Sequence, residues 1–206
     1  LKWSRDLSFI LVASLLAGFI AKIPVIFGVN EDYFYPRHLG FIFLPLLAAY
    51  FAWKNRIELK KILVIFGIML LSLLYINLLP GGDTNDSFIL ACLHLPLVLW
   101  VLLGASFVGN KRNDQFRRLD FLKYNGDLLV MVALIVIAGG IMSGVTIGLF
   151  SLIGFHIEEI YFENVGVFGI AAAPLVATFL IRTNPQLVGK VSPVIARIFS
   201  PLVLIM

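Results

Sequence analysis

Long apolar runs separated by short polar connections dominate the chain. A helix needs about 20 apolar residues to cross the roughly 30 Å of hydrocarbon in a bilayer. We therefore predict six membrane-spanning helices and the start of a seventh, at residues 7–28, 36–53, 61–79, 87–108, 126–154, 164–182 and 191–206. The runs are continuous and lack the alternating segments of about 10 residues that build transmembrane barrels. The predicted fold is an all-α, polytopic transmembrane helical bundle, with residues 1–206 in a single domain.

Composition excludes an ordinary water-soluble globule. The 206 residues are 60% hydrophobic and 14% charged, whereas soluble domains are about 45–50% apolar and about 25% charged. Cys92 is the single cysteine, so no internal disulfide is expected, and its place in the fourth span predicts a packing residue. The chain begins at Leu1 and stops at Met206 in an apolar run, and we therefore expect it to be a segment of a longer protein.

Basic residues gather on one side of the predicted bundle. With six alternating spans, 14 of the 16 basic residues fall on the side of the N-terminus, namely Lys2, Arg5, Lys54, Arg56, Lys60, Lys61, Lys111, Arg112, Arg117, Arg118, Lys123, Arg182, Lys190 and Arg197. Acidic residues dominate the opposite connections, where Arg37 is the basic exception. Because short cytoplasmic loops are enriched in Lys and Arg, this asymmetry predicts a cytoplasmic N-terminus. It also explains the net charge of +4 without a nucleic-acid partner.

The connection from Asn110 to Asn125 is the longest. One interpretation is a short helix on the inner leaflet, with its basic residues at anionic lipid headgroups. The other is a solvated basic loop. The helix is favoured by apolar residues at three-residue intervals, namely Phe116, Leu119 and Leu122. Their basic neighbours are Arg117, Arg118 and Lys123.

Small residues mark one face of the fifth predicted span. Gly140, Gly144 and Gly148 recur every four residues, a spacing that lets helix backbones approach closely. Tight packing inside the bundle is the first interpretation, and a subunit interface or a hinge are the alternatives. This span has about 30 residues, so it must tilt, break near Gly139–Gly140 or protrude from the bilayer.

Four polar residues lie in the outer half of the predicted spans, namely Lys22, Tyr75, Asn77 and His94. At a rise of 1.5 Å per residue, Lys22 lies roughly 8 Å and His94 roughly 10 Å below the outer boundary. Ionisable groups at such depth usually face a cavity, and we predict that the four residues line one. The alternatives are a Lys22 side chain that extends to the interface and a His94 that bonds a neighbouring helix. Interior prolines are expected to bend these spans, at Pro24, Pro45, Pro96 and Pro174.

Catalytic and metal-binding patterns are weak. The acidic segment around His156 and Glu158 fits no established ligand spacing, so we predict no metal site and no cofactor. No nucleophile elbow, phosphate-binding glycine loop or dinucleotide fingerprint occurs in the sequence, and no catalytic residue is predicted.

The stretch from Phe168 to Met206 resembles a bacterial membrane family, the domain of unknown function 4153 family (DUF4153). Most of the resemblance is carried by the run RTNPQLVGKVSPVIARIFSPL. It implies a multi-pass protein of the bacterial inner (cytoplasmic) membrane. The family has no established reaction, so the resemblance transfers no catalytic residue.

Three functions fit these observations. Transport of a small solute or ion would use the polar cavity of the outer half. A structural or regulatory membrane subunit would bind a membrane protein partner, or a second copy of the chain, through the glycine face of span five. An intramembrane enzyme acting on a lipid-linked substrate would need an acid/base or metal set that the sequence does not supply. The sequence favours transport slightly over the subunit.

Overall fold

The computed structural model describes residues 2–79, 86–110 and 114–184. Within these residues every regular element is a helix. The elements are α1 (Lys2–Ala21), α2 (Ile23–Phe27), α3 (Glu31–Lys54), α4 (Leu59–Leu78), α5 (Asp86–Val108), α6 (Gln115–Leu152), α7 (Glu158–Tyr161), the π-helix η1 (Phe162–Gly166) and α8 (Val167–Thr183). The predicted all-helical class is therefore confirmed. The predicted seventh span at 191–206 lies outside the described residues.

Four of the described helices are long and apolar enough to cross a membrane: α4, α5, α6 and the continuous helical segment Glu158–Thr183. The other two long helices, α1 and α3, carry more charge. Helix α1 begins with Lys2, Arg5 and Asp6, and α3 holds Arg37 and His38 in its first half.

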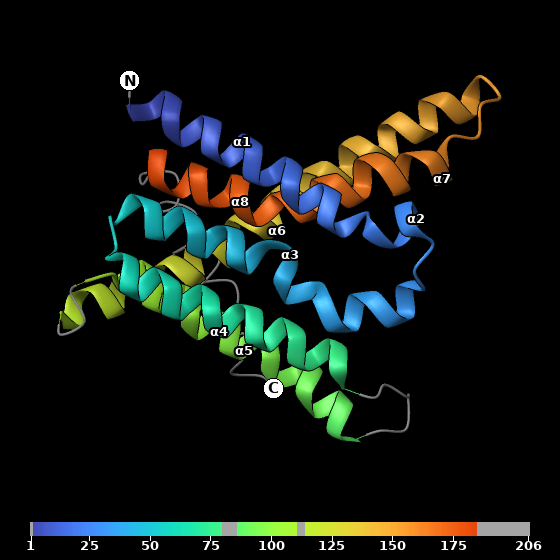
Figure 1. The fold of residues 1–206 in the computed structure, drawn as a ribbon. Helices are drawn as coiled ribbons and strands as arrows, with labels where there is room; N and C mark the ends of the chain where they lie inside the picture. The colour runs from blue at the N-terminus through green and yellow to red at the C-terminus, as the bar shows by residue number, and fades with distance from the viewer. Residues whose placement is uncertain (1, 80–85, 111–113, 185–206) are drawn as a thin grey trace, which may run out of the picture.

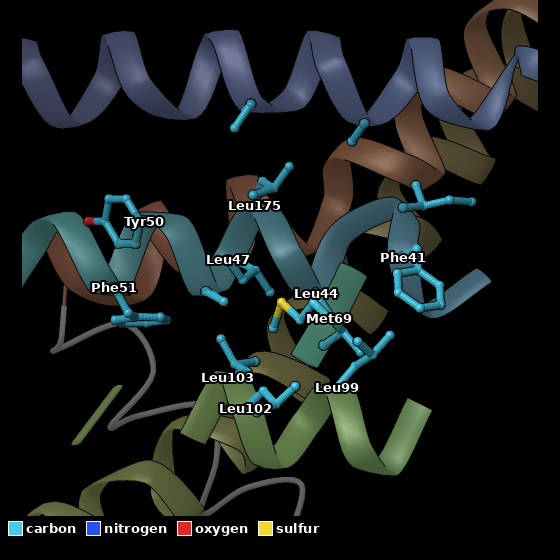
Figure 2. Close-up of a cluster of buried hydrophobic side chains, with 14 of the residues drawn as sticks. Phe41, Leu44, Leu47, Tyr50, Phe51, Met69, Leu99, Leu102, Leu103 and Leu175 are labelled. Atoms are coloured by element: carbon cyan, nitrogen blue, oxygen red, sulfur yellow. The ribbon is translucent and has the colours of Figure 1, made fainter. Parts of the chain in front are cut away.

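The helices pack in layers around α3 (Figure 1). Helices α1 and α8 lie side by side above it, α4 and α5 lie below it, and α6 crosses behind and packs mainly on α8. Figure 2 shows the core where α3 meets the other helices, with Leu47, Tyr50 and Phe51 fully buried beside Leu99 and Leu103 of α5. Because lipid tails are as apolar as these side chains, van der Waals packing holds such a core together.

Prolines accompany a helix break in the first predicted span and a bend in the second. Helix α1 ends at Ala21, and α2 restarts with Pro24 near its first position, so the helix predicted as the first span is divided at Lys22. Gly28 then ends α2 with a φ of +64°, a left-handed conformation that glycine adopts without strain. Helix α3 contains Pro36 and Pro45 and changes direction along its length (Figure 1). Each interior proline removes one backbone hydrogen bond and bends the helix.

Helix α6 corrects two expectations. It begins at Gln115, where the Asp114 side chain accepts hydrogen bonds from Phe116 N and Arg117 N, and it continues to Leu152. The segment expected to form a separate interfacial helix or a loop is thus the first part of the same helix as span five. The helix also runs through Gly139–Gly140 without a break. Its 38 residues extend about 57 Å at 1.5 Å per residue, far beyond one bilayer crossing.

Candidate functional site

The start of α1, the end of α3, the start of α4 and the end of α5 meet at one end of the bundle, which is rich in lysine and arginine. Lys54 at the end of α3 forms an ion pair with Asp6 near the start of α1. Asn55, the next residue, donates to the carbonyl oxygen of Phe107 in α5 at 2.8 Å. Lys61 of α4 donates to the side chain of Asn110, just beyond α5, at 3.2 Å. These contacts join α1, α3, α4 and α5 at what we term the basic end.

A small polar cavity of about 210 Å³ lies at the basic end. It is lined by Asn55, Phe107, Arg117, Asp120 and Arg182, and so combines two guanidinium groups with one carboxylate. Arg182, in the last turn of α8, also lies over two aromatic rings of α3, with its Cζ atom 5.9 Å from the Tyr50 centroid and 5.5 Å from the Phe51 centroid. Cation–π attraction of this kind orients an arginine that has no neighbouring acid on its own helix.

A larger groove of about 710 Å³ runs between α4, α5 and α6 at the same end. Lys60, Lys61 and Arg118 line it together with apolar and aromatic side chains, among them Trp100 and Phe121. The three residues predicted to contact lipid at the inner leaflet are thus separated. Arg117 lines the small cavity, Arg118 lines the groove, and Lys123 is exposed. Sequence analysis counted Lys60 and Lys61 among the basic residues but did not place them beside Arg118, because only the tertiary structure brings α4 next to α6.

Lys22 lies at the break between α1 and α2 and is half-buried. Its ammonium group donates to the side-chain oxygen of Asn164. Asn164 belongs to η1 and also donates to the backbone oxygen of Ile160 at 2.7 Å. The contact therefore joins a proline-associated helix break to a π-helical turn, a kind of distortion that is common at functional sites.

The other three members of the predicted polar cavity lie elsewhere. Asn77 contacts the Nε2 atom of His38 at 3.1 Å, and the Nδ1 atom of the exposed His94 contacts the backbone oxygen of Leu90 at 2.8 Å. Tyr75 is exposed. No hydrogen bond joins any two of the four predicted residues, all of which the structure describes, and none of them lines the small cavity or the groove at the basic end. The structure does not bring them together as one site.

Arg37 is a buried cation that sequence analysis assigned to an outer connection. Its side chain is 4% exposed, and its Cζ atom lies 3.7 Å from the ring centroid of Tyr33 and 4.3 Å from that of Phe88. One of its terminal nitrogens donates to the backbone oxygen of Tyr33 at 3.0 Å. The signal available in the sequence was the tyrosine four residues before the arginine, one helical turn away.

The glycine face of α6 points away from the bundle. A Cβ atom added to Gly140, Gly144 or Gly148 would meet no atom of residues 2–79, 86–110 or 114–184 within 4 Å. Among the described residues, no other helix packs on this stripe, so its interpretation as tight packing inside the bundle stays a prediction. Close helix packing occurs instead between α1 and α8, where the small residues Ala13, Ala17 and Ala21 are buried at four-residue spacing.

Among the described residues, no group of three or more His, Cys, Asp or Glu side chains is placed to hold a metal ion. His156 and Glu158 lie 3.7 Å apart and are largely exposed. The arrangement at the basic end can attract anions, while most of the buried side chains among the described residues are apolar.

The helices and their hydropathy define the class: an all-helical protein with apolar helices able to cross a membrane. Comparison of the chain with protein-family models, with curated proteins and with solved structures gives no match. The resemblance to DUF4153 therefore stays a prediction.

Proposed function

We propose that the protein is a structural or regulatory subunit of a bacterial inner membrane that assembles with a second membrane helix through the outward face of α6. In this proposal six segments cross the bilayer: α1 with α2, α3, α4, α5, α6, and α7 to α8. The N-terminus lies in the cytoplasm, because the basic end carries the positive charges that short cytoplasmic loops retain. The bacterial location rests on the resemblance to DUF4153.

The open glycine face of α6 carries the proposal. Only 6% of the apolar stretch of α6 is buried, against 17% to 33% in the other three candidate spans. Ser143, which is partly covered and donates to Tyr161, lies beside the glycine stripe, and the partly covered Thr146 lies on a different side of the helix. A glycine stripe exposes helix backbone, which gains more from close contact with another helix than from mobile lipid tails.

Transport has less support from this geometry. A transport site needs polar groups that converge on one path, and Lys22, Tyr75, Asn77 and His94 belong to separate local contacts. An enzyme acting on a lipid-linked substrate would need a convergent acid and base, which these four residues do not supply. The subunit role is therefore the function that the described residues favour.

Site-specific crosslinking tests the proposed assembly. A benzophenone amino acid at position 144, placed in the protein in its native membrane, should trap a protein partner upon irradiation. The matched control is position 142, because Met142 is also exposed and lies about 200° around the helix from Gly144. Mass spectrometry then distinguishes a second copy from another membrane protein. A probe at 144 that traps no protein, or a probe at 142 that traps as much, would refute the proposal.

The proposed orientation predicts a labelling pattern. In a Cys92→Ala background, a membrane-impermeant maleimide applied to intact cells with a permeabilised outer membrane should label Glu159→Cys but not Gln115→Cys. Both native residues are exposed, so access to the reagent alone decides the result. After lysis both variants should react. Labelling of Gln115→Cys in intact cells would invert the orientation.

A further inference from the structure

The groove between α4, α5 and α6 has a charged end and apolar walls. Lys60 and Lys61 lie in the first turn of α4, and Arg118 lies in the first turn of α6. The walls are formed by apolar side chains such as Val64 and Val101 and by the rings of Trp100 and Phe121. A site with this division of chemistry suits an amphiphile, with a negative group at one end and hydrocarbon along the rest.

The charged end favours an anion for a second reason. The first turn of α4 contains no acidic residue, although the positive end of a helix dipole favours negative charge there. Glu58 precedes the helix but does not line the groove. Neither Lys60 nor Lys61 forms an ion pair with a carboxylate of the described residues. A bound anion would therefore gain from both the lysines and the helix terminus.

The length of the groove matches one leaflet of a bilayer. Its lining along α5 extends from Gly109, the residue after the helix, to Trp100, which is about 14 Å at 1.5 Å per residue. Half of a hydrocarbon core of roughly 30 Å has about the same depth. The volume of about 710 Å³ also falls within the usual range for sites that hold small molecules.

Two contacts hold α5 close against α6 in the wall of the groove. Gly104 has no side chain, and a Cβ atom there would lie 2.9 Å from the ring of Phe121. The Trp100 indole donates to the side chain of Asn125 at 2.8 Å, which fixes α5 against α6. The site is therefore formed before any ligand enters.

From this combination of charge, length and shape, we infer that the groove binds one anionic membrane lipid. The headgroup lies at Lys60, Lys61 and Arg118, and an acyl chain follows α5 toward Trp100. The three cations favour a negatively charged headgroup. The length of the groove, which matches one leaflet, favours a lipid over a free anion.

Native mass spectrometry of the purified protein tests the assignment, with phosphatidylglycerol as the anionic probe and phosphatidylcholine as the neutral one. Phosphatidylglycerol should be retained preferentially. Each lysine near an anionic surface contributes about a fivefold gain, so Lys60→Gln with Lys61→Gln should weaken its retention roughly 30-fold. The matched control is Arg5→Gln with Lys123→Gln, which removes the same charge from exposed positions that do not line the groove.

A second variant separates the groove from general surface charge. Ala105→Phe keeps all three cations but fills the groove, and it should abolish preferential retention while circular dichroism and thermal stability stay unchanged. Equal retention of the two lipids would overturn the assignment, as would an equal loss in the Arg5/Lys123 control. An Ala105→Phe variant that still retains phosphatidylglycerol would overturn it as well. The assignment would also be overturned if a second copy of the chain covered the groove and Ala105→Phe dissociated that dimer.

Discussion

Replacing Phe51 with alanine is expected to lower the free energy of unfolding by about 3 kcal/mol. This value is the lower end of the usual range for a buried phenylalanine, because lost packing rather than lost hydrophobic transfer dominates in a bilayer. Phe51 is fully buried at the centre of an aromatic cluster. Its ring centroid lies 4.9 Å from that of Phe107 and 5.1 Å from that of Tyr124.

The consequences of Phe51→Ala should reach the basic end. Arg182 lies over the Phe51 ring, and both Arg182 and Phe107 line the small polar cavity. Removing the ring therefore takes away one support of the cavity as well as core packing. Thermal unfolding in a mild detergent measures the change in stability.

Phe116→Ala is the matched control for this prediction, because Phe116 is 78% exposed in the first turn of α6. It should leave the midpoint of unfolding nearly unchanged. If Phe51→Ala and Phe116→Ala unfold at the same temperature, the ring of Phe51 does not hold the core together.

Replacing Gly18 with alanine is expected to cost about 1–3 kcal/mol, the usual range for overpacking. A Cβ atom at Gly18 would lie 2.7 Å from Cγ of Phe168 and closer still to two other atoms of the ring. The ring also stacks edge-on against Phe19, with centroids 5.5 Å apart. The new methyl group can therefore be accommodated only if α1 and α8 separate or the ring is displaced.

Gly67→Ala is the control for the general effect of replacing a helical glycine. Its Cβ atom would meet no atom of the described residues within 4 Å, so the substitution should be neutral or should stabilise α4 by up to about 1 kcal/mol. A double-mutant cycle adds a second test. Gly18→Ala should cost less in a Phe168→Leu background, because the clash is with the ring. Equal costs in both backgrounds would show that Phe168 is not the obstacle.

Much of the helical architecture follows from local sequence. Apolar runs of about the length that a bilayer requires predict all-helical segments without any knowledge of packing, and the sorting of charged residues between connections predicts their orientation. The proline signals were also local. Pro24 lies beside the break between α1 and α2 because the lost backbone hydrogen bond depends only on the chain near it.

The continuity of α6 was harder to predict. The segment 110–125 is polar and basic, which suggested a connection separate from span five. The Asp114 cap starts the helix, and packing of Phe121 and Tyr124 into the core stabilises its first part. A buried face that forms against α3 and α5 is not visible from residues 110–125 alone.

The candidate sites depend on distant parts of the chain. The sequence placed Lys22 and Asn77 in the outer half of their predicted spans but did not give their partners, because the contacts with Asn164 and His38 depend on how helices pack side by side. The glycine stripe shows the same limit, since a spacing of four residues allows close packing without specifying the neighbour.

The sequence by itself determined the helical class, the approximate helix positions and the separation of basic from acidic connections, because these depend on local composition and on the length of apolar runs. Only the tertiary structure decided that α6 turns its glycines outward and that lysines of α4 share a groove with an arginine of α6. The physical reason is that the rotation of each helix about its axis is set by side-chain contacts with other helices, which are distant in sequence.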